Sequence, residues 1–280
     1  MSIHNRVRKI HRRNLGMSYE IQNASLHPVL KRIYANRHIN SLAQIDYSLD
    51  RLANYKQLKG IDTAADIVAD AVVNNQQILI VGDYDADGAT STALVVRALN
   101  SFGAEKVNYL VPNRFEYGYG LTPEIVDVAT EFSPEVLITV DNGISSIDGV
   151  SAAKRHNIKV VVTDHHLPGQ QLPDADAIVN PNQPGCEFPS KSIAGVGVAF
   201  YLMLAVRAAL RDRDWFNAQR VTPNMADLLV LVALGTVADV VPLDENNRIL
   251  VEQGIRRMRG GKARAGIRAL FKAAGKDIRA

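Results

Sequence analysis

Cysteine is almost absent from this sequence of 280 residues, which has only Cys186. A lone cysteine excludes an internal disulfide scaffold and is typical of a protein in a reducing compartment. Long apolar runs are also lacking, because the two best candidates, residues 194–206 and 228–238, end at Arg207 and Asp239. Both are shorter than the roughly 18 apolar residues that a membrane span requires. We therefore expect a cytoplasmic protein that makes no contact with a membrane.

The composition is that of a folded chain with a substantial core. Apolar residues make up 47% of the sequence and charged residues 22%, which excludes a disordered or collagen-like protein. The length suits one large domain or two ordinary ones. Residues 1–14 contain five Lys or Arg residues, but no apolar segment follows them. This excludes a secretory signal.

Positive charge gathers at the C-terminal end. Residues 255–280 contain nine Lys or Arg residues and one Asp, whereas the preceding residues contain 23 basic and 28 acidic ones. A basic segment of this kind can follow a phosphate backbone. A solvated helix face, or a linker to a segment outside this sequence, explains it equally well. Charge alone does not decide between these interpretations.

Short β-branched runs alternate with helical patterns from residue 77 onward. The runs are almost continuously hydrophobic, as expected for strands that are buried on both faces of a sheet. Strand–helix–strand alternation predicts an α/β fold in which helices flank a parallel β-sheet. The expected strands are residues 77–81, 106–111, 136–140, 159–162 and 177–179, and the expected helices between them are residues 90–102, 123–131 and 146–156.

Helical patterns dominate on both sides of this alternating region. Apolar residues recur at spacings of three and four in residues 26–35 and 64–74, and again in residues 193–210 and 225–238. The glycines among the positive charges of the last 20 residues suggest that this end packs poorly. We expect three parts: a helical N-terminal segment (1–75), a sheet-containing domain (76–254) and a basic linker towards a further domain (255–280).

Acidic residues follow three of the expected strands. The carboxyl ends of parallel strands meet at one edge of the sheet, which is where ligands bind in such folds. An Asp at a strand end is most often only a turn or cap residue, so the inference rests on several strands that deliver such groups to the same edge. The residues concerned are Asp83, Asp85 and Asp87 after the first strand, Asp141 after the third, Asp164, His165 and His166 after the fourth, and Asp239 at the end of an apolar helix.

Carboxylates crowded in this way repel one another, and a bound cation relieves the repulsion. Carboxylates alone suit Mg²⁺ or Ca²⁺, while added imidazole shifts the preference towards Mn²⁺ or another first-row ion. The ligands suffice for two ions, with Asp141 as a natural bridge. Two ions about 3.5–4 Å apart are a standard device for hydrolysing a phosphoester.

A calcium-binding EF-hand is the competing interpretation of the first motif. Asp83, Asp85, Asp87 and Gly88 match positions 1, 3, 5 and 6 of its loop. Position 12 is Leu94 in place of the required Glu, and a strand precedes the motif where a helix is needed. Both facts exclude the EF-hand.

Four motifs resemble, in order and spacing, those of the DHH phosphoesterase superfamily. They are residues 83–88 (DYDADG), 141–143 (DNG), 164–166 (DHH) and 235–239 (GTVAD). Residues 111–116 (VPNRFE) and 192–197 (SIAGVG) are similar to the RecJ family of exonucleases within that superfamily. The resemblance extends from about residue 25 to the C-terminus and implies a DHH-type domain for residues 76–254.

The resemblance also implies a role for each motif residue. Asp141 is the ligand that two metal ions share, and Asp164 orients the neighbouring histidine. His166 faces the substrate and holds a phosphate oxygen, so Asp141, Asp164 and His166 form the expected catalytic set. The implied cofactor is two Mn²⁺ ions, with Mg²⁺ as the alternative. The implied metal ligands are Asp83, Asp85, Asp87, Asp141, His165 and Asp239.

Further residues are candidates for contact with the substrate. Arg114, between a strand end and a glycine-aromatic run, is a candidate phosphate clamp, and Tyr117 and Tyr119 could stack on bases. Ser192, Gly195 and Gly197 precede or begin an apolar helix whose backbone amides could approach a phosphate. Tight packing of that helix, and a buried turn around the tyrosines, explain the same residues.

The expected function is metal-dependent 5′→3′ hydrolysis of single-stranded DNA in repair and recombination, by a water molecule and without a protein nucleophile. The expected partners are single-stranded DNA with a 5′ end and, through the full-length protein, a single-strand-binding protein or helicase. RecJ enzymes are longer than this chain, so it corresponds to an N-terminal catalytic part. The alternatives are a DHH phosphodiesterase for short oligonucleotides or cyclic dinucleotides, a pyrophosphatase, and an inactive scaffold.

Overall fold

The computed structural model describes residues 16–279 and separates into two compact units, with the boundary between Tyr47 and Ser48. In the smaller unit, the Ser18 hydroxyl accepts a hydrogen bond from the Ile21 amide and so caps a short helix. The basic arm at residues 3–13 lies outside the described residues. The elements of the smaller unit are α1 (Tyr19–Asn23), α2 (Pro28–Asn36) and the 3₁₀ turn η1 (Leu42–Ile45).

The larger unit is built on a five-stranded sheet in which every pairing is parallel, with strand order β2-β1-β3-β4-β5. The three central strands are buried on both faces, which explains their continuous hydrophobicity. The predicted α/β class with a parallel sheet is confirmed, and the predicted strands agree within one residue at each end. The strands are β1 (Ile78–Gly82), β2 (Val107–Leu110), β3 (Val136–Val140), β4 (Lys159–Thr163) and β5 (Ala177–Val179).

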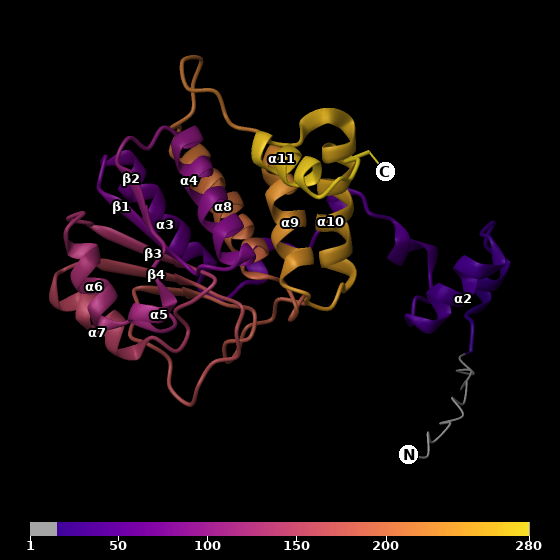
Figure 1. The fold of residues 1–280 in the computed structure, drawn as a ribbon, viewed down its shortest axis with the longest axis horizontal. Helices are drawn as coiled ribbons and strands as arrows, with labels where there is room; N and C mark the ends of the chain where they lie inside the picture. The colour runs from indigo at the N-terminus through magenta and orange to yellow at the C-terminus, as the bar shows by residue number, and fades with distance from the viewer. Residues whose placement is uncertain (1–15, 280) are drawn as a thin grey trace, which may run out of the picture. The chain divides into compact units, whose positions relative to one another are not determined.

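Helices cover both faces of the sheet (Figure 1). On one face, Leu79, Val81 and Leu137 pack with buried residues of α6 (Pro123–Thr130) and α7 (Ile147–Arg155). On the other face, Ile78, Ile80 and Ile138 belong to a larger cluster. Its helices are α3 (Ile61–Val73), α4 (Ala86–Phe102), α8 (Gly195–Asp212) and α9 (Leu229–Ala238).

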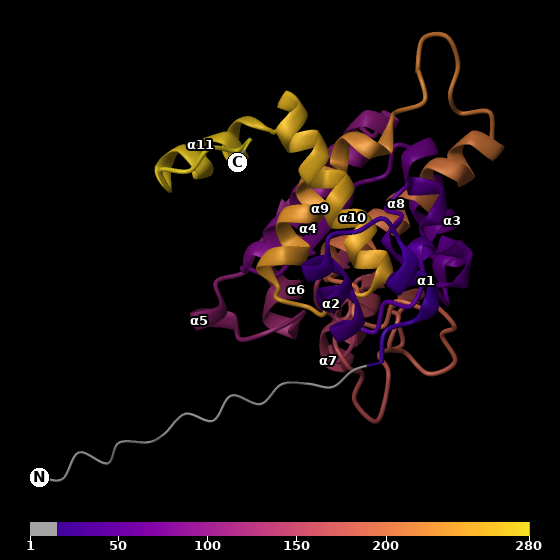
Figure 2. The same cartoon turned by 90° about the vertical axis from the view of Figure 1, so that its right-hand side faces the viewer.

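Helix α10 (Glu245–Arg257) lies alongside α9 in both views of the molecule (Figures 1 and 2). Gly254 permits this close approach, since a Cβ atom there would collide with the backbone carbonyl of Leu229. Shorter elements complete the unit: η2 (Leu49–Arg51), η3 (Tyr55–Gln57), α5 (Arg114–Tyr117), η4 (Met225–Leu228), the π-helical turn η5 (Met258–Lys262) and α11 (Ala265–Ala273).

The C-terminal end was expected to pack poorly, but it forms helices that pack against the core. Helix α10 continues to Arg257, and α11 follows after the π-helical turn. Met258, Ala263 and Ile267 are buried and join the larger core cluster, because apolar residues interrupt the positive charges at intervals that a helix can bury. The assignment of residues 255–280 as a linker, like the other predicted boundaries, stays a prediction.

The predicted helix at residues 90–102 begins four residues earlier in the structure. The Asp85 side chain accepts a hydrogen bond from the Gly88 amide and so caps α4, which starts at Ala86. The acidic motif therefore forms the first turn of the helix. Among the residues that the structure describes, no helix is long and apolar enough to cross a membrane.

Candidate metal centre

The strand ends bring three acidic side chains to one edge of the sheet, as predicted. Asp83, Asp141 and Asp164 directly follow the last residues of β1, β3 and β4, and all three are buried. Asp141 has a left-handed backbone with φ of 61°, a conformation that Asp tolerates better than most residues. Its amide donates to the Thr163 carbonyl at 3.1 Å, so the pairing of β3 with β4 continues into the site.

The N-terminus of α8 meets the acidic cluster through Asp87. The carboxylate of Asp87 accepts hydrogen bonds from the amides of Gly195 at 2.6 Å and Val196 at 2.9 Å. These are donors that the first turn of a helix leaves free, and they carry the positive end of the helix dipole. A Cβ atom on Gly195 would lie 2.5 Å from Asp141 Oδ1. Only glycine therefore allows α8 to approach both carboxylates.

His165 lies at the centre of the cluster. Its Nε2 atom is 3.1 Å from Asp141 Oδ1, 3.7 Å from Asp239 Oδ2 and 3.9 Å from Asp87 Oδ2. Asp239 directly follows Ala238, the last residue of α9. This helix therefore brings a predicted acidic residue from outside the sheet to the same cluster. One imidazole thus faces three carboxylates from three different elements.

Burial and mutual repulsion hold protons on this cluster. Burial, followed by the charges of Asp85 and Asp164, raises the pKa of Asp141 to about 9. Burial, followed by the charge of Asp141, raises the pKa of Asp87 to about 8. Each ionised carboxylate is therefore unfavourable here unless a cation offsets its charge.

Asp164 differs from Asp141, because the protein supplies several hydrogen-bond donors to its carboxylate. Its carboxylate accepts from the amides of Ile144, His165 and His166, and it contacts His166 Nδ1 at 2.7 Å. Burial acts to raise the pKa of Asp164, but the hydrogen bond and charge of His166, with these amides, outweigh it and lower that pKa. In return, the hydrogen bond to Asp164 raises the pKa of His166 to about 9. His166 is nearly half exposed, so this cation is open to a ligand.

Tyr119 and Arg114 form the outer rim. The Tyr119 hydroxyl lies 3.2 Å from His166 Nδ1 and 3.4 Å from the Asp141 carbonyl oxygen. Burial and the charge of Asp164 raise the pKa of Tyr119. The Arg114 guanidinium forms an ion pair of 2.6 Å with Asp83 and lies over the rings of Tyr84 and Tyr119, at 4.1 and 5.1 Å from their centres. The rim is thus aromatic and cationic.

Several buried ligand atoms at the centre have no hydrogen-bond partner among the described residues. They are Asp141 Oδ1, His165 Nε2 and Asp239 Oδ2. Buried polar atoms are almost always satisfied, and the 3.1 Å contact between Asp141 Oδ1 and His165 Nε2 does not have the geometry of a hydrogen bond. Two carboxylate oxygens and an imidazole nitrogen in this state suit the binding of a cation. Three groups have ligand atoms within 4.8 Å of one another: Asp83, Asp85 and Asp141; Asp87, His165 and Asp239; and Asp141, His165 and His166.

A family model described as "DHH family, N-terminal domain" matches residues 77–236, which is more than half of the chain. This chain belongs to the DHH family. It is 54% identical over 96% of its length to "Single-stranded-DNA-specific exonuclease RecJ" of Salmonella typhimurium strain LT2, of which it covers 47%. The chain therefore spans about half the length of such relatives.

Solved structures of RecJ have the same fold as this DHH domain. A crystal structure of exonuclease RecJ bound to manganese matches with a TM-score of 0.69 and 35% identity, over 79% of this chain and 53% of that one. RecJ from Thermus thermophilus in complex with Mn²⁺ matches with a TM-score of 0.72 and 31% identity, over 89% of this chain and 34% of that one.

The residues predicted to contact the substrate have different surroundings in the structure. The Gly195 amide is bound to Asp87, so it is not free to meet a phosphate. Gly197 packs against the Ile193 side chain, where a Cβ atom would collide, and this favours the packing interpretation. The Ser192 carbonyl accepts from Asn247 at 2.8 Å. Arg114 lies at the rim, close enough to bind Asp83, and Tyr117 packs against the smaller core cluster.

One contact differs from the role that the resemblance implied. Asp164 was expected to orient the histidine that binds the metal, His165. Its carboxylate contacts the ring of His166 and only the backbone amide of His165. The reason is geometric, because the turn after β4 directs the His165 ring towards Asp141 and the His166 ring back over Asp164.

Three asparagines support the DHH motif and were not predicted. Asn142 donates to the carbonyls of Val81 and Val140, which ties the ends of β1 and β3 together. Asn180 and Asn182 donate to the carbonyls of His166 and His165 at 3.0 and 2.7 Å. The available signal was that Asn180 and Asn182 follow β5 at the same edge of the sheet as the acidic residues.

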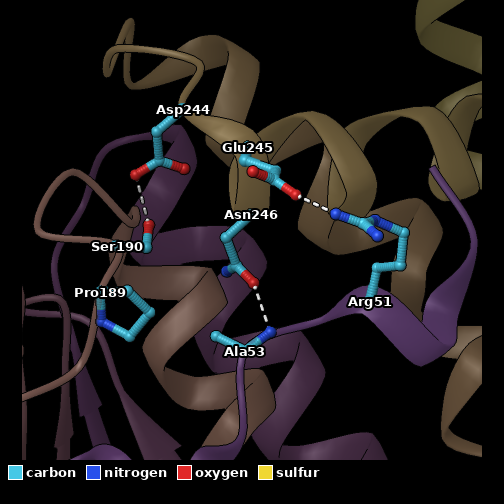
Figure 3. Close-up of a pocket in the computed structure, with 7 residues that line it drawn as sticks. All are labelled: Arg51, Ala53, Pro189, Ser190, Asp244, Glu245 and Asn246. Atoms are coloured by element: carbon cyan, nitrogen blue, oxygen red, sulfur yellow. Dashed lines mark hydrogen bonds and ion pairs between the residues drawn. The ribbon is translucent and has the colours of Figure 1, made fainter. Parts of the chain in front are cut away.

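A second polar network surrounds a cavity between residues 51–53, the loop before α8 and the start of α10 (Figure 3). Asp244 caps α10 and accepts from Ser190 at 2.7 Å, which anchors the loop that leads into α8. The Asn246 side chain accepts from the Ala53 amide at 3.1 Å and from the Tyr201 hydroxyl at 2.8 Å. The other residues around this cavity are Arg51, Pro189 and Glu245, with an Arg51–Glu245 ion pair of 2.8 Å.

Proposed function

We propose that this chain is the catalytic part of a divalent-metal-dependent exonuclease that degrades single-stranded DNA from its 5′ end in repair and recombination. The observation that carries the proposal is the orphaned set of Asp141 Oδ1, His165 Nε2 and Asp239 Oδ2 at the centre of a buried acidic cluster. The names of the RecJ relatives, and the manganese in two of their structures, support the substrate and the metal.

The residues divide into two overlapping sets of metal ligands. Asp83, Asp85 and Asp141 would hold one ion, and Asp87, His165 and Asp239, with the Asp141 carboxylate shared, would hold the other. When bound, two Mn²⁺ or Mg²⁺ ions supply an activated water and neutralise charge on the phosphoryl oxygens. Carboxylate oxygens keep further lone pairs after they accept a hydrogen bond, so Asp83 and Asp87 stay competent as ligands.

His166 would stabilise the negative charge on the phosphoryl group without help from a metal ion. Asp164 keeps it protonated near neutral pH and holds its ring through Nδ1. Because its side chain is partly exposed, the ring presents a fixed positive donor to a phosphoryl oxygen whose negative charge grows in the transition state. The Tyr119 hydroxyl also restrains this ring, at 3.2 Å from Nδ1 and 3.4 Å from Nε2. No protein nucleophile is needed.

The rim residues would position the strand. Arg114 is 37% exposed and lies between two aromatic rings, so it can contact a phosphate while Tyr84 and Tyr119 contact bases. We further propose that a single-strand-binding protein or a helicase acts through the full-length protein. A cytoplasmic location follows from the proposed DNA substrate.

The test is cleavage of a single strand that carries different labels at its two ends, in the presence of Mn²⁺. We expect mononucleotides from the 5′ end, and no cleavage by the Asp141→Asn variant. An Asp127→Asn variant, which removes an exposed carboxylate in α6, serves as the matched control. Rapid cleavage of dinucleotides with intact long strands would contradict the exonuclease and favour a phosphodiesterase for short substrates.

A further inference from the structure

A second polar cavity lies at the other end of α4 from the carboxylate cluster. It has a volume of about 480 Å³ and is bounded by α4, by η4 and by the residue that precedes α11. Arg97 on α4 and Arg264 before α11 both line it. Arg97 is ten residues beyond Asp87 on the same helix, which separates the two sites by roughly 15 Å along its axis.

The two arginines line the same cavity without an acidic partner that neutralises both. Within the described part of the chain, no hydrogen bond or ion pair engages Arg97, and Arg264 donates only to the Asp227 carbonyl oxygen, at 3.3 Å. The Nε atom of Arg264 is buried and has no partner there. Burial, followed by the charge of Arg97, lowers the pKa of Arg264, while the charge of Asp227 opposes this effect.

We propose that Arg97 and Arg264 form a binding site for a phosphoryl oxyanion, separate from the metal centre. An oxyanion between the two guanidinium groups would relieve their repulsion and give the buried Nε–H an acceptor. Guanidinium groups match the geometry of phosphate oxygens better than other cations do. Asp227 is the only carboxylate among the residues around this cavity, so the net charge of the site remains positive.

In this site, Arg264 of the basic C-terminal segment has a specific role in binding. Arg264 belongs to residues 255–280, whose charge was explained equally well by nucleic-acid binding or by a solvated face. The bound anion is either a phosphodiester of a single strand or free phosphate, which share the same chemistry. Binding of free phosphate does not depend on the proposed exonuclease activity, so failure of one proposal does not entail failure of the other.

The first experiment titrates inorganic phosphate into the metal-free protein and follows the arginine Nε–Hε signals by NMR. We expect two signals to shift, one absent in Arg97→Gln and the other in Arg264→Gln, and each variant to bind phosphate at least about fivefold more weakly. Lys262→Gln removes the same charge from an exposed position nearby and should bind like the wild type. Asp227→Asn removes the opposing carboxylate and should tighten binding by about threefold.

The second experiment distinguishes the two sources of the anion. Binding of a fluorescent oligothymidylate is measured in EDTA over a range of salt concentrations. If a DNA phosphate occupies the site, Arg97→Gln and Arg264→Gln weaken binding and lower the salt dependence by about 0.7 per lost contact. If the strand binds unchanged while phosphate binding is lost, the ligand is a free phosphate and the site stands.

Unchanged phosphate binding by both arginine variants would overturn the proposal, and so would unchanged or weaker binding by Asp227→Asn. Urea unfolding of each variant checks that the fold is retained. The Asp227→Asn arm also guards against a folding defect, because a damaged protein does not bind an anion more tightly.

Discussion

Replacing Asp141 by asparagine should stabilise the metal-free protein and remove its response to Mn²⁺. The carboxylate is almost fully buried and its Oδ1 atom has no hydrogen-bond partner in residues 16–279. Asparagine has the same shape and tolerates the left-handed backbone at this position, where φ is 61°. Its side-chain oxygen can still face His165 Nε2. The substitution therefore removes the ionisable group while it leaves the packing in place.

The magnitude follows from the pKa of Asp141. This pKa is about 9 in the folded protein against 3.8 for an unperturbed Asp, so the folded state holds a proton that the unfolded state loses. Stability contributed by that proton is complete below about pH 4 and declines by about 1.4 kcal/mol per pH unit up to about pH 9. At about pH 7.5 the loss is at most about 5 kcal/mol. Relaxation and an effective dielectric near 20 reduce it, and we expect Asp141→Asn to recover about 1–3 kcal/mol.

The assay is urea unfolding near pH 5.5 and near pH 7.5, in EDTA and in Mn²⁺. The wild type in EDTA should lose stability as the pH rises, and the variant should lose less. A saturating ion at about 100 times its Kd adds about 2.7 kcal/mol to the wild type, whereas Asp141→Asn should gain almost nothing. Asp127→Asn, which changes an exposed carboxylate, should follow the wild type within about 0.5 kcal/mol.

Two results would refute this reasoning. If Asp141→Asn in EDTA were less stable than the wild type near pH 7.5, the buried carboxylate would not be the source of instability. If Mn²⁺ stabilised the variant as much as the wild type, Asp141 would not be a metal ligand.

Three further predictions test the rest of the site. His166→Gln should keep the stabilisation by Mn²⁺ but lower kcat by about 100-fold or more, since it removes the positive charge that faces the phosphoryl group; an unchanged kcat would contradict its role. Gly195→Ala should lower the free energy of unfolding by about 1–3 kcal/mol and weaken Mn²⁺ binding, because its Cβ would lie 2.5 Å from Asp141 Oδ1; urea unfolding and calorimetry measure both effects. Arg114→Gln should raise KM for single-stranded DNA by about tenfold with a smaller change in kcat, and the reverse pattern in steady-state kinetics would place Arg114 in the chemical step.

The fold could be predicted because local and global signals agree. The apolar runs around Ile80, Ile138 and Val161 are continuous, and the structure buries these strands on both faces. Their carboxyl ends necessarily share an edge, so the meeting of Asp83, Asp141 and Asp164 followed from topology alone. The predicted start of α4 is four residues too late because Asp85, a predicted metal ligand, also caps the helix.

The sequence did not indicate which of the acidic residues would receive hydrogen bonds from the protein and which would not. Asp141 and Asp164 occupy equivalent places after neighbouring strands, yet one carboxylate has an orphaned oxygen and the other accepts from three amides and an imidazole. That difference depends on the path of the backbone over the two or three residues after each strand. The surroundings of Asp87 likewise depend on Gly195, whose amide donates to it from a segment more than 100 residues away in the sequence.

This division explains how a fold can tolerate so many buried carboxylates. The protein supplies its own donors to Asp164, through the turn amides and His166, and these contacts lower the pKa of that carboxyl. Within the described residues Asp141 Oδ1 accepts no hydrogen bond, and burial raises the pKa of Asp141, so its ionised form is favoured only beside a cation. Burial of the Asp141 carboxyl thus destabilises the metal-free protein and, through the same electrostatic penalty, favours the binding of a metal ion.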